Sequence, residues 1–316
     1  MTEPAIDADN HTTLVYDIYA PQYPWWCFNF LILIWCLGCL TEFILLRTNA
    51  FGISSKFQAL TLEKRRNVVI YILQIFVTTL SLALQLAGGV DLIFRLDDTT
   101  SELRFTMMLV SSQIIFVLYM WELIYRISIG TPLLVHHVMT CVMAQLLALS
   151  IFDAYAVVYL RLAVILSCYA TTEQSSFVAL LCYRLDLFSK KVQYNLFTLA
   201  AIQSFIFKTA IAIFSLLYFC VTFYIQGEAD DQPTNWKWFW KICFIPLVVV
   251  LFGAQVYSSQ ILWTLRLKCS SEVEESNQEN PQSMDASSES KSTQLLDTVM
   301  DDSLRRVRDV SCEIDV

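Results

Sequence analysis

Two adjacent histidines, His136 and His137, lie inside an apolar stretch of the sequence, and Glu122 and Arg126 precede them. Ionisable side chains are costly inside a membrane, and they usually face a bundle interior or a water-filled cavity. An imidazole there can act as a general base at neutral pH, or reorganise a site when it is protonated. Residues 119–153 are therefore our candidate functional centre.

Two further basic residues, Arg161 and Lys208, lie within apolar runs and have no carboxylate one helical turn away. Each therefore needs a hydrogen-bond acceptor from another segment, and the carboxylates of Glu122 and Glu173 are the obvious candidates. Glu122 and Arg126, about one turn apart, could also neutralise each other. We predict a buried polar network of Glu122, Arg126, His136, His137, Arg161, Glu173 and Lys208. Such a network can serve a functional site or only the architecture of a bundle, and the sequence leaves both readings open.

The ten cysteines do not form a metal-binding pattern. Most lie in or beside apolar segments, where cysteine behaves as a small apolar residue. His137 and Cys141 stand four residues apart, but no zinc-type spacing completes a site around them. We therefore predict neither a metal nor a cofactor. Cys269, just past the last apolar segment, is a candidate for palmitoylation.

Apolar segments of membrane-spanning length must position these side chains. The residues A, V, I, L, M, F, W, Y and C make up 56% of the chain, which is typical of membrane proteins. A helix needs roughly 20 residues to cross a bilayer. Windows of about that length lie at 24–46, 67–90, 105–128, 131–152, 154–170, 196–224 and 239–264. The sequence thus predicts an all-α, polytopic membrane bundle of about seven transmembrane helices.

The fifth window is the shortest, and a polar stretch at 171–176 separates it from the apolar residues 177–182. Residues 154–185 are therefore either one long helix or two. In lipid, a broken helix is tolerated only where protein or water satisfies its backbone groups. A break at this place would consequently line a cavity.

Basic residues in the connections predict the orientation, because Lys and Arg in short loops mark the cytoplasmic side. They gather in the segments 47–66, 184–191 and 266–268. We therefore predict a lumenal or extracellular N-terminus (1–23), a transmembrane bundle (24–269) and a cytosolic tail (270–316). Asn10, in the sequon Asn-His-Thr, would then be accessible to glycosylation.

The tail has 12 acidic and 4 basic residues, which accounts for the whole net charge of -8. Its polar, acidic composition predicts disorder over most of its length. The rest of the chain is neutral and offers nucleic acid no basic patch, so we expect no nucleic-acid partner. The ending Ile314-Asp315-Val316 has the form that strand-addition domains capture, which makes a protein partner of the tail a further hypothesis.

The order of these residues resembles the TLC family, named for the TRAM, LAG and CLN proteins. Trp121-Glu122 and Gly130 precede His136-His137-x-x-Thr140, and Arg161 follows about two dozen residues later. The stretch 173–177 is similar to the family's Glu-x-Ser-x-x-Phe motif, and Lys208 lies inside the next helix. The resemblance covers roughly residues 65–265. The paired aspartates that follow the histidines of ceramide synthases are missing, so the chain looks closer to the family's non-synthase members.

The resemblance implies a membrane protein, commonly of the endoplasmic reticulum rather than the plasma membrane, that binds, senses or regulates membrane lipid. A second hypothesis is an acyl-CoA-dependent N-acyltransferase of the ceramide synthase type, in which His136 or His137 is catalytic. A third hypothesis, from the helix count and the orientation of the termini, is a seven-helix receptor or channel.

Overall fold

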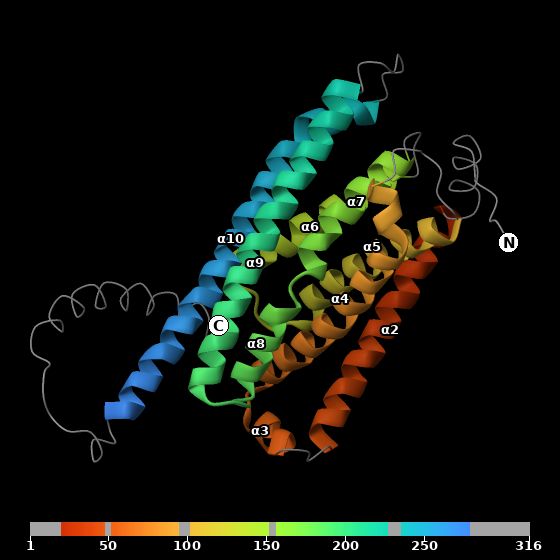
Figure 1. The fold of residues 1–316 in the computed structure, drawn as a ribbon. Coiled ribbons are helices and arrows are strands. Elements are labelled where there is room, and N and C mark those ends of the chain that lie inside the picture. The colour runs from red at the N-terminus through yellow and green to blue at the C-terminus, as the bar shows by residue number, and fades with distance from the viewer. Residues whose placement is uncertain (1–19, 48–51, 95–101, 152–155, 227–234, 279–316) are drawn as a thin grey trace, which may run out of the picture.

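Helices make up the regular structure of the described part of this computed structural model, namely residues 20–47, 52–94, 102–151, 156–226 and 235–278 (Figure 1). The predicted all-α membrane bundle is thereby confirmed. The elements are α2 (Ala20–Arg47), α3 (Ile53–Ala59), α4 (Leu62–Phe94), α5 (Glu102–Tyr125), α6 (Thr131–Ile151), α7 (Ala156–Thr171), α8 (Gln174–Arg184), α9 (Lys190–Cys220), the π-helical η3 (Val221–Gln226) and α10 (Asn235–Gln278).

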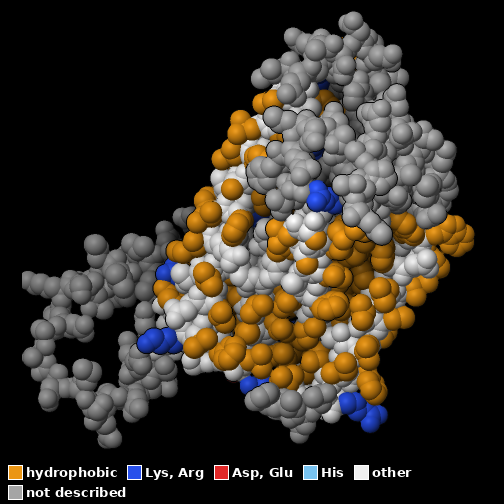
Figure 2. All heavy atoms as spheres, turned by 45° about the vertical axis from the view of Figure 1, so that its right-hand side comes forward, with side chains coloured by type: hydrophobic (Ala, Val, Ile, Leu, Met, Phe, Trp, Pro, Cys, Tyr) orange, Lys and Arg blue, Asp and Glu red, His pale blue; other side chains and the backbone are white. Residues whose placement is uncertain are grey.

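Six of the described helices are long and apolar enough to cross a membrane, namely α2, α4, α5, α6, α9 and α10. The surfaces of these helices are also suited to lipid, because many large apolar side chains point outward from them. Phe76, Phe205 and Ile242, for example, are each at least half exposed, at 57%, 50% and 68%. Hydrophobic side chains cover much of the face shown in Figure 2, as a lipid-facing surface requires.

The fifth predicted crossing is divided into two helices. The 16 residues of α7 are too few for a full span, and the 11 residues of α8 continue the path. The break lies at residues 172–173, which answers the question that the sequence left open. Neither α7 nor α8 is among the six described helices that are long and apolar enough to cross a membrane, so the described residues show six such spans where about seven were predicted.

Side chains satisfy the backbone groups that the break leaves without helical partners. Thr172 Oγ1 donates a hydrogen bond to the carbonyl oxygen of Cys168 at 2.7 Å, and Gln174 Nε2 donates to that of Thr171 at 2.6 Å. These two carbonyl oxygens are therefore paired within the protein, as a helix break inside a membrane requires.

The helices form two outer groups with a middle layer between them (Figure 1). On one side α4 and α5 pack together with α2, and on the other side α9 and α10 pack along their length. The middle helices touch both groups: α6 contacts α5 and α10, α7 contacts α4 and α9, and α8 contacts α4 and α9. The polar residues of interest therefore lie where the middle layer meets its neighbours.

The basic segments that the sequence assigned to one side do lie at one end of the bundle. Lys56 Nζ donates to the backbone oxygen of Asp186 at 2.6 Å, which joins α3 to the α8–α9 connection. Lys190 Nζ and Glu272 Oε2 lie 3.0 Å apart, which joins the start of α9 to the end of α10. Lys and Arg side chains appear along the lower edge of the face in Figure 2.

Two boundaries differ from the sequence prediction. Helix α10 continues to Gln278, past the predicted end of the bundle at residue 269, because its last turns pack against the start of α9. The short helix α3 falls in a segment that was predicted only as a basic loop. Residues 1–19 and 279–316, with the Asn10 sequon and most of the tail, lie outside the described residues.

Candidate functional site

A cavity of about 500 Å³, which we call the polar cavity, lies between α4, α5, α6, α8 and α10. Its size is within the range typical of ligand sites, roughly 300–1,000 Å³. Five of the seven residues in the predicted network line it, namely Glu122, Arg126, His136, His137 and Glu173. The helix break lies at its wall, because Glu173 directly precedes α8.

Glu122 is the hub of the contacts in the polar cavity, and its side chain is only 2% exposed. Arg126 Nε donates to Glu122 Oε1 at 2.8 Å, from the position four residues later in the chain. Gln74 Nε2, on α4, donates to the other carboxylate oxygen. Arg126 also donates to Asn67 Oδ1 at 2.8 Å, so the guanidinium holds α4 and α5 together. A buried carboxylate needs this many partners to remain charged.

The two histidines occupy different surroundings on the first turns of α6. His137 is buried, and its Nε2 lies 3.2 Å from Glu122 Oε1, although at an angle outside hydrogen-bond geometry. Its ring stacks on Tyr119, with the ring centres 4.6 Å apart and the planes at 24°. His136 is partly exposed to the cavity, and Gln255 Nε2 of α10 lies 3.2 Å from its Nε2.

Lys208 lies behind the wall of the polar cavity and does not line it. Its Nζ is 2.7 Å from Glu173 Oε1, and it also donates to the backbone oxygen of Tyr169. The residue is 1% exposed. Because Tyr169 belongs to α7 and Glu173 precedes α8, one ammonium group on α9 joins both sides of the helix break.

Arg161 is not brought to this site. It lies on α7 eight residues before Tyr169, which corresponds to ~12 Å along a helix axis. It lines neither cavity described here. The structure thus brings six of the seven predicted network residues to one region and leaves Arg161 nearer the other end of α7.

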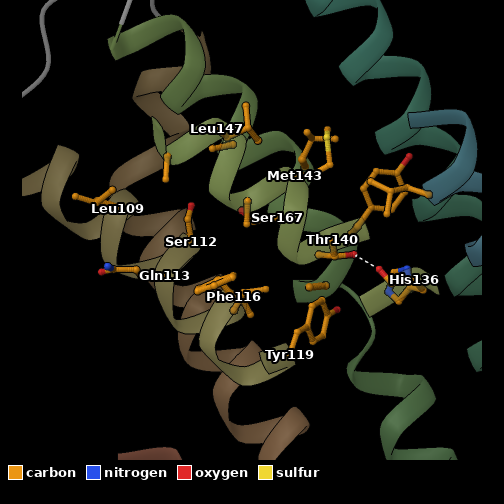
Figure 3. A pocket seen from close by; sticks show the side chains of 18 of the residues that line it. Leu109, Ser112, Gln113, Phe116, Tyr119, His136, Thr140, Met143, Leu147 and Ser167 are labelled. Atoms are coloured by element: carbon orange, nitrogen blue, oxygen red, sulfur yellow. Dashed lines mark hydrogen bonds between the residues drawn. The ribbon is translucent and has the colours of Figure 1, made fainter. Parts of the chain in front are cut away.

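A second, narrower cavity lies beside the first, with a volume of about 70 Å³. We call it the apolar cavity, because side chains such as Leu109, Phe116 and Leu147 dominate its lining (Figure 3). Figure 3 shows Tyr119 and His136 together, away from Leu109 and Leu147; the dashed line marks the 2.8 Å bond from Thr140 Oγ1 to the His136 carbonyl. On α5, Leu109 and Tyr119 are ten residues apart, or ~15 Å.

Three residues, Tyr119, His136 and Gln255, line both cavities and so form a wall that the cavities share. The polar cavity lies on the side of this wall toward Arg126 and the basic end of the bundle, since α5 runs from Leu109 past Tyr119 to Arg126. The two cavities together therefore present polar groups near one end of the bundle and apolar groups deeper inside it.

Several buried polar atoms in the polar cavity have no hydrogen-bond partner within the described structure. They are both ring nitrogens of His137, Oγ of Ser176, Nε of Arg184 and the side-chain oxygens of Gln74 and Gln255. Buried polar groups in native proteins are nearly always paired, and each exception needs an explanation. These atoms are enclosed by neighbouring protein groups and do not themselves face the cavity.

Sequence reasoning missed Gln74, Gln255 and the cavity-facing position of Arg184. Each glutamine is an amide inside an apolar run, and such a group is costly in a membrane unless it is paired. That signal alone could have marked both glutamines as members of the network. Their partners, by contrast, depend on helix packing between segments 48 and 119 residues apart.

Cys269 is buried between α9 and α10 in this structure, with an exposure of 0%. Its sulfur points toward Gln193 Oε1, 4.0 Å away. The residue also lies within α10, and not beyond the last helix as predicted. A thiol enclosed in this way cannot react with an acyl donor unless the two helices separate. Within the described residues, no group of three His, Cys, Asp or Glu side chains could hold a metal ion.

The fold and the site define a class of protein, an all-α multi-pass membrane bundle with a buried polar cavity beside an apolar one. Comparison with protein-family models, curated proteins and solved structures found no match to this chain.

Proposed function

We propose that this protein binds an amphipathic membrane lipid, with the headgroup in the polar cavity and a short part of an acyl chain in the apolar cavity. The observation that carries this proposal is that Tyr119, His136 and Gln255 line both cavities, so a polar site lies directly beside an apolar one. Ligand sites are usually mostly apolar, with a few convergent polar groups that fix the orientation.

The proposal includes the TLC resemblance and what it implies, a location in the endoplasmic reticulum and a role in binding, sensing or regulating lipid. Four residues of the resembling motifs, Glu122, His136, His137 and Glu173, line one cavity, which supports it. We also propose that the basic end of the bundle faces the cytosol. The polar cavity would then lie toward the cytosolic leaflet, and the tail would be open to a cytosolic partner.

Extraction of the full chain in a mild detergent, followed by mass spectrometry of the lipids that remain bound, tests this function. Ala144 lines the apolar cavity, so Ala144→Leu should reduce the retained lipid several-fold. Ala210 is exposed on α9, and Ala210→Leu should leave the amount unchanged. Both variants must elute as the unmodified protein does on gel filtration. Equal retention by the two variants would contradict binding in this cavity.

A second candidate is N-acyl transfer from acyl-CoA, which the Glu122 and His137 pair favours. A carboxylate 3.2 Å from an imidazole can stabilise the imidazolium that forms when the histidine accepts a proton. Incubation with labelled acyl-CoA and a long-chain amine tests this reaction. Product formation that His137→Ala or His136→Ala abolishes would establish the enzyme, whereas retained lipid without turnover would leave binding as the function.

A further inference from the structure

Of the two arginines in the lining of the polar cavity, Arg184 is the one that has no acidic partner among the described residues. The lining also contains Arg126 and two carboxylates, those of Glu122 and Glu173. Glu122 pairs with Arg126, and Glu173 pairs with Lys208 from behind the wall. With neutral histidines, these two pairs cancel, and the guanidinium of Arg184 is the charge in the lining that neither pair neutralises.

The side of α8 that carries Arg184 faces the cavity. Ser176 and Leu180 line the cavity at eight and four residues before Arg184, which is the spacing of one helix face. The Nε atom of Arg184 is buried and has no hydrogen-bond partner in the described part of the chain. The support for a ligand is therefore that Arg184 lines the cavity and has no acidic partner among the described residues, because a guanidinium is suited to a carboxylate or phosphate oxygen.

We propose that the polar cavity selects a lipid with an anionic headgroup, and that Arg184 is the residue that provides this selectivity. The inference depends on the lipid-binding function proposed above and adds the chemical class of the ligand.

A different role for Arg184 would follow from its place in the last turn of α8. Long basic side chains near the ends of membrane helices extend toward the interface with their charge in water. In that case the residue would stabilise the position of the bundle in the membrane and would have no effect on which ligand the cavity prefers. Selectivity for headgroup charge separates the two roles.

The test compares single-chain lipids that share one acyl chain and differ in headgroup. Lysophosphatidic acid is anionic, monoacylglycerol is neutral, and each is added to the full-length protein in a neutral detergent, with binding followed by native mass spectrometry. The unmodified protein should prefer lysophosphatidic acid. Arg184→Gln should weaken the binding of lysophosphatidic acid roughly 10- to 100-fold, the range expected for a hydrogen bond to a charged group. The same substitution should leave the affinity for monoacylglycerol unchanged. Arg184→Lys should retain part of the preference.

Lys191→Gln is the matched control, because Lys191 is an exposed basic residue at the same end of the bundle that does not line the cavity. It should not change either affinity. Equal binding of the two lipids by the unmodified protein, or a preference that survives Arg184→Gln, would overturn the inference and leave the lipid-binding function intact. Binding of neither lipid would remove both proposals. Inorganic phosphate alone, bound as tightly as lysophosphatidic acid and with the same dependence on Arg184, would assign the site to a soluble anion instead.

Discussion

At the scale of single residues, the ion pair of Lys208 and Glu173 connects the site to the fold. The lysine is 1% exposed and reaches from α9 to both sides of the break between α7 and α8. Removal of one partner from a buried pair leaves an uncompensated charge, and this usually costs more than the intact pair contributes. The contribution of Lys208 can therefore be separated from that of Glu173 only by changing both residues.

Lys208→Met should destabilise the protein by about 3–5 kcal/mol, because Glu173 would remain buried without its cation. The measurement is the thermal unfolding temperature in mild detergent. In the double variant with Glu173→Gln, part of that loss should be recovered. Lys191→Met, at an exposed position of the same helix, is the control. A double variant as unstable as the sum of its single changes would show that the two side chains do not act as a pair.

Cys269 allows a second test at this scale. Because it is enclosed between α9 and α10, its thiol should resist a water-soluble maleimide in the folded protein and react after denaturation. A variant in which Cys269 is the only remaining cysteine gives this measurement. In cells, acyl-biotin exchange should give the same signal for Cys269→Ser as for the unmodified chain. A signal that this substitution abolishes would mean that the two helices open in the membrane.

At the scale of elements, α4 packs closely on the first turns of α5, at the end of that helix far from Glu122. Two adjacent glycines of α4 face α5 at the level of Arg104 to Met108. An added Cβ at Gly88 would lie 3.1 Å from the backbone oxygen of Arg104, and neither backbone can move easily. At Gly89 the nearest atom, 2.9 Å away, is the sulfur of Met108, at the end of a flexible side chain.

Gly88→Ala should therefore destabilise the protein by about 1–3 kcal/mol, as overpacking usually does. Gly89→Ala should cost less, since Met108 can adopt another rotamer. Gly253→Ala is the control, because an added Cβ there would have nothing within 4 Å, and alanine favours a helix by up to ~1 kcal/mol over glycine. The unfolding temperature should therefore be lowest for Gly88→Ala, higher for Gly89→Ala and highest for Gly253→Ala. A Gly88→Ala variant as stable as the unmodified protein would contradict the close approach of α4 to α5.

At the scale of the whole molecule, the sequence predicted the class of fold well. Helices of membrane length follow from apolar composition alone, so the six long spans could be predicted from the sequence. The break in the fifth crossing was more difficult, because the polar stretch at 171–176 fits either a broken helix or a polar face of a continuous one. Its outcome depends on Lys208, which is 35 residues beyond Glu173 in the chain.

The candidate site was only partly accessible to the same reasoning. Charged residues in apolar runs could be collected into a set, since each one needs a partner in a membrane. Which of these charged residues come into contact depends on how α7 and α9 are placed along the bundle axis. In the structure this placement brings Lys208 to Glu173 and leaves Arg161 away from both cavities. The geometry around Gln74 and Gln255 likewise required the packing of distant helices.

The orientation of the molecule in its membrane is a prediction of the same scale. With the N-terminus in the lumen, Asn10 should carry a glycan, so that digestion with a glycosidase changes the electrophoretic mobility of the protein and Asn10→Gln removes the change. A tag at the C-terminus should be reached by antibody when only the plasma membrane is permeabilised. A tag that stays protected under these conditions would reverse the predicted orientation.

The hydrogen bonds at the break between α7 and α8 have a consequence for the cost of binding. Thr172, Gln174 and Lys208 donate to three carbonyl oxygens at this interruption, those of Cys168, Thr171 and Tyr169, and none of these bonds needs an occupant of the cavity. The site is thus preorganised, and little conformational entropy is lost when a guest enters it. Amide hydrogen exchange around residues 172–176 should accordingly be as slow in the empty protein as in the loaded one.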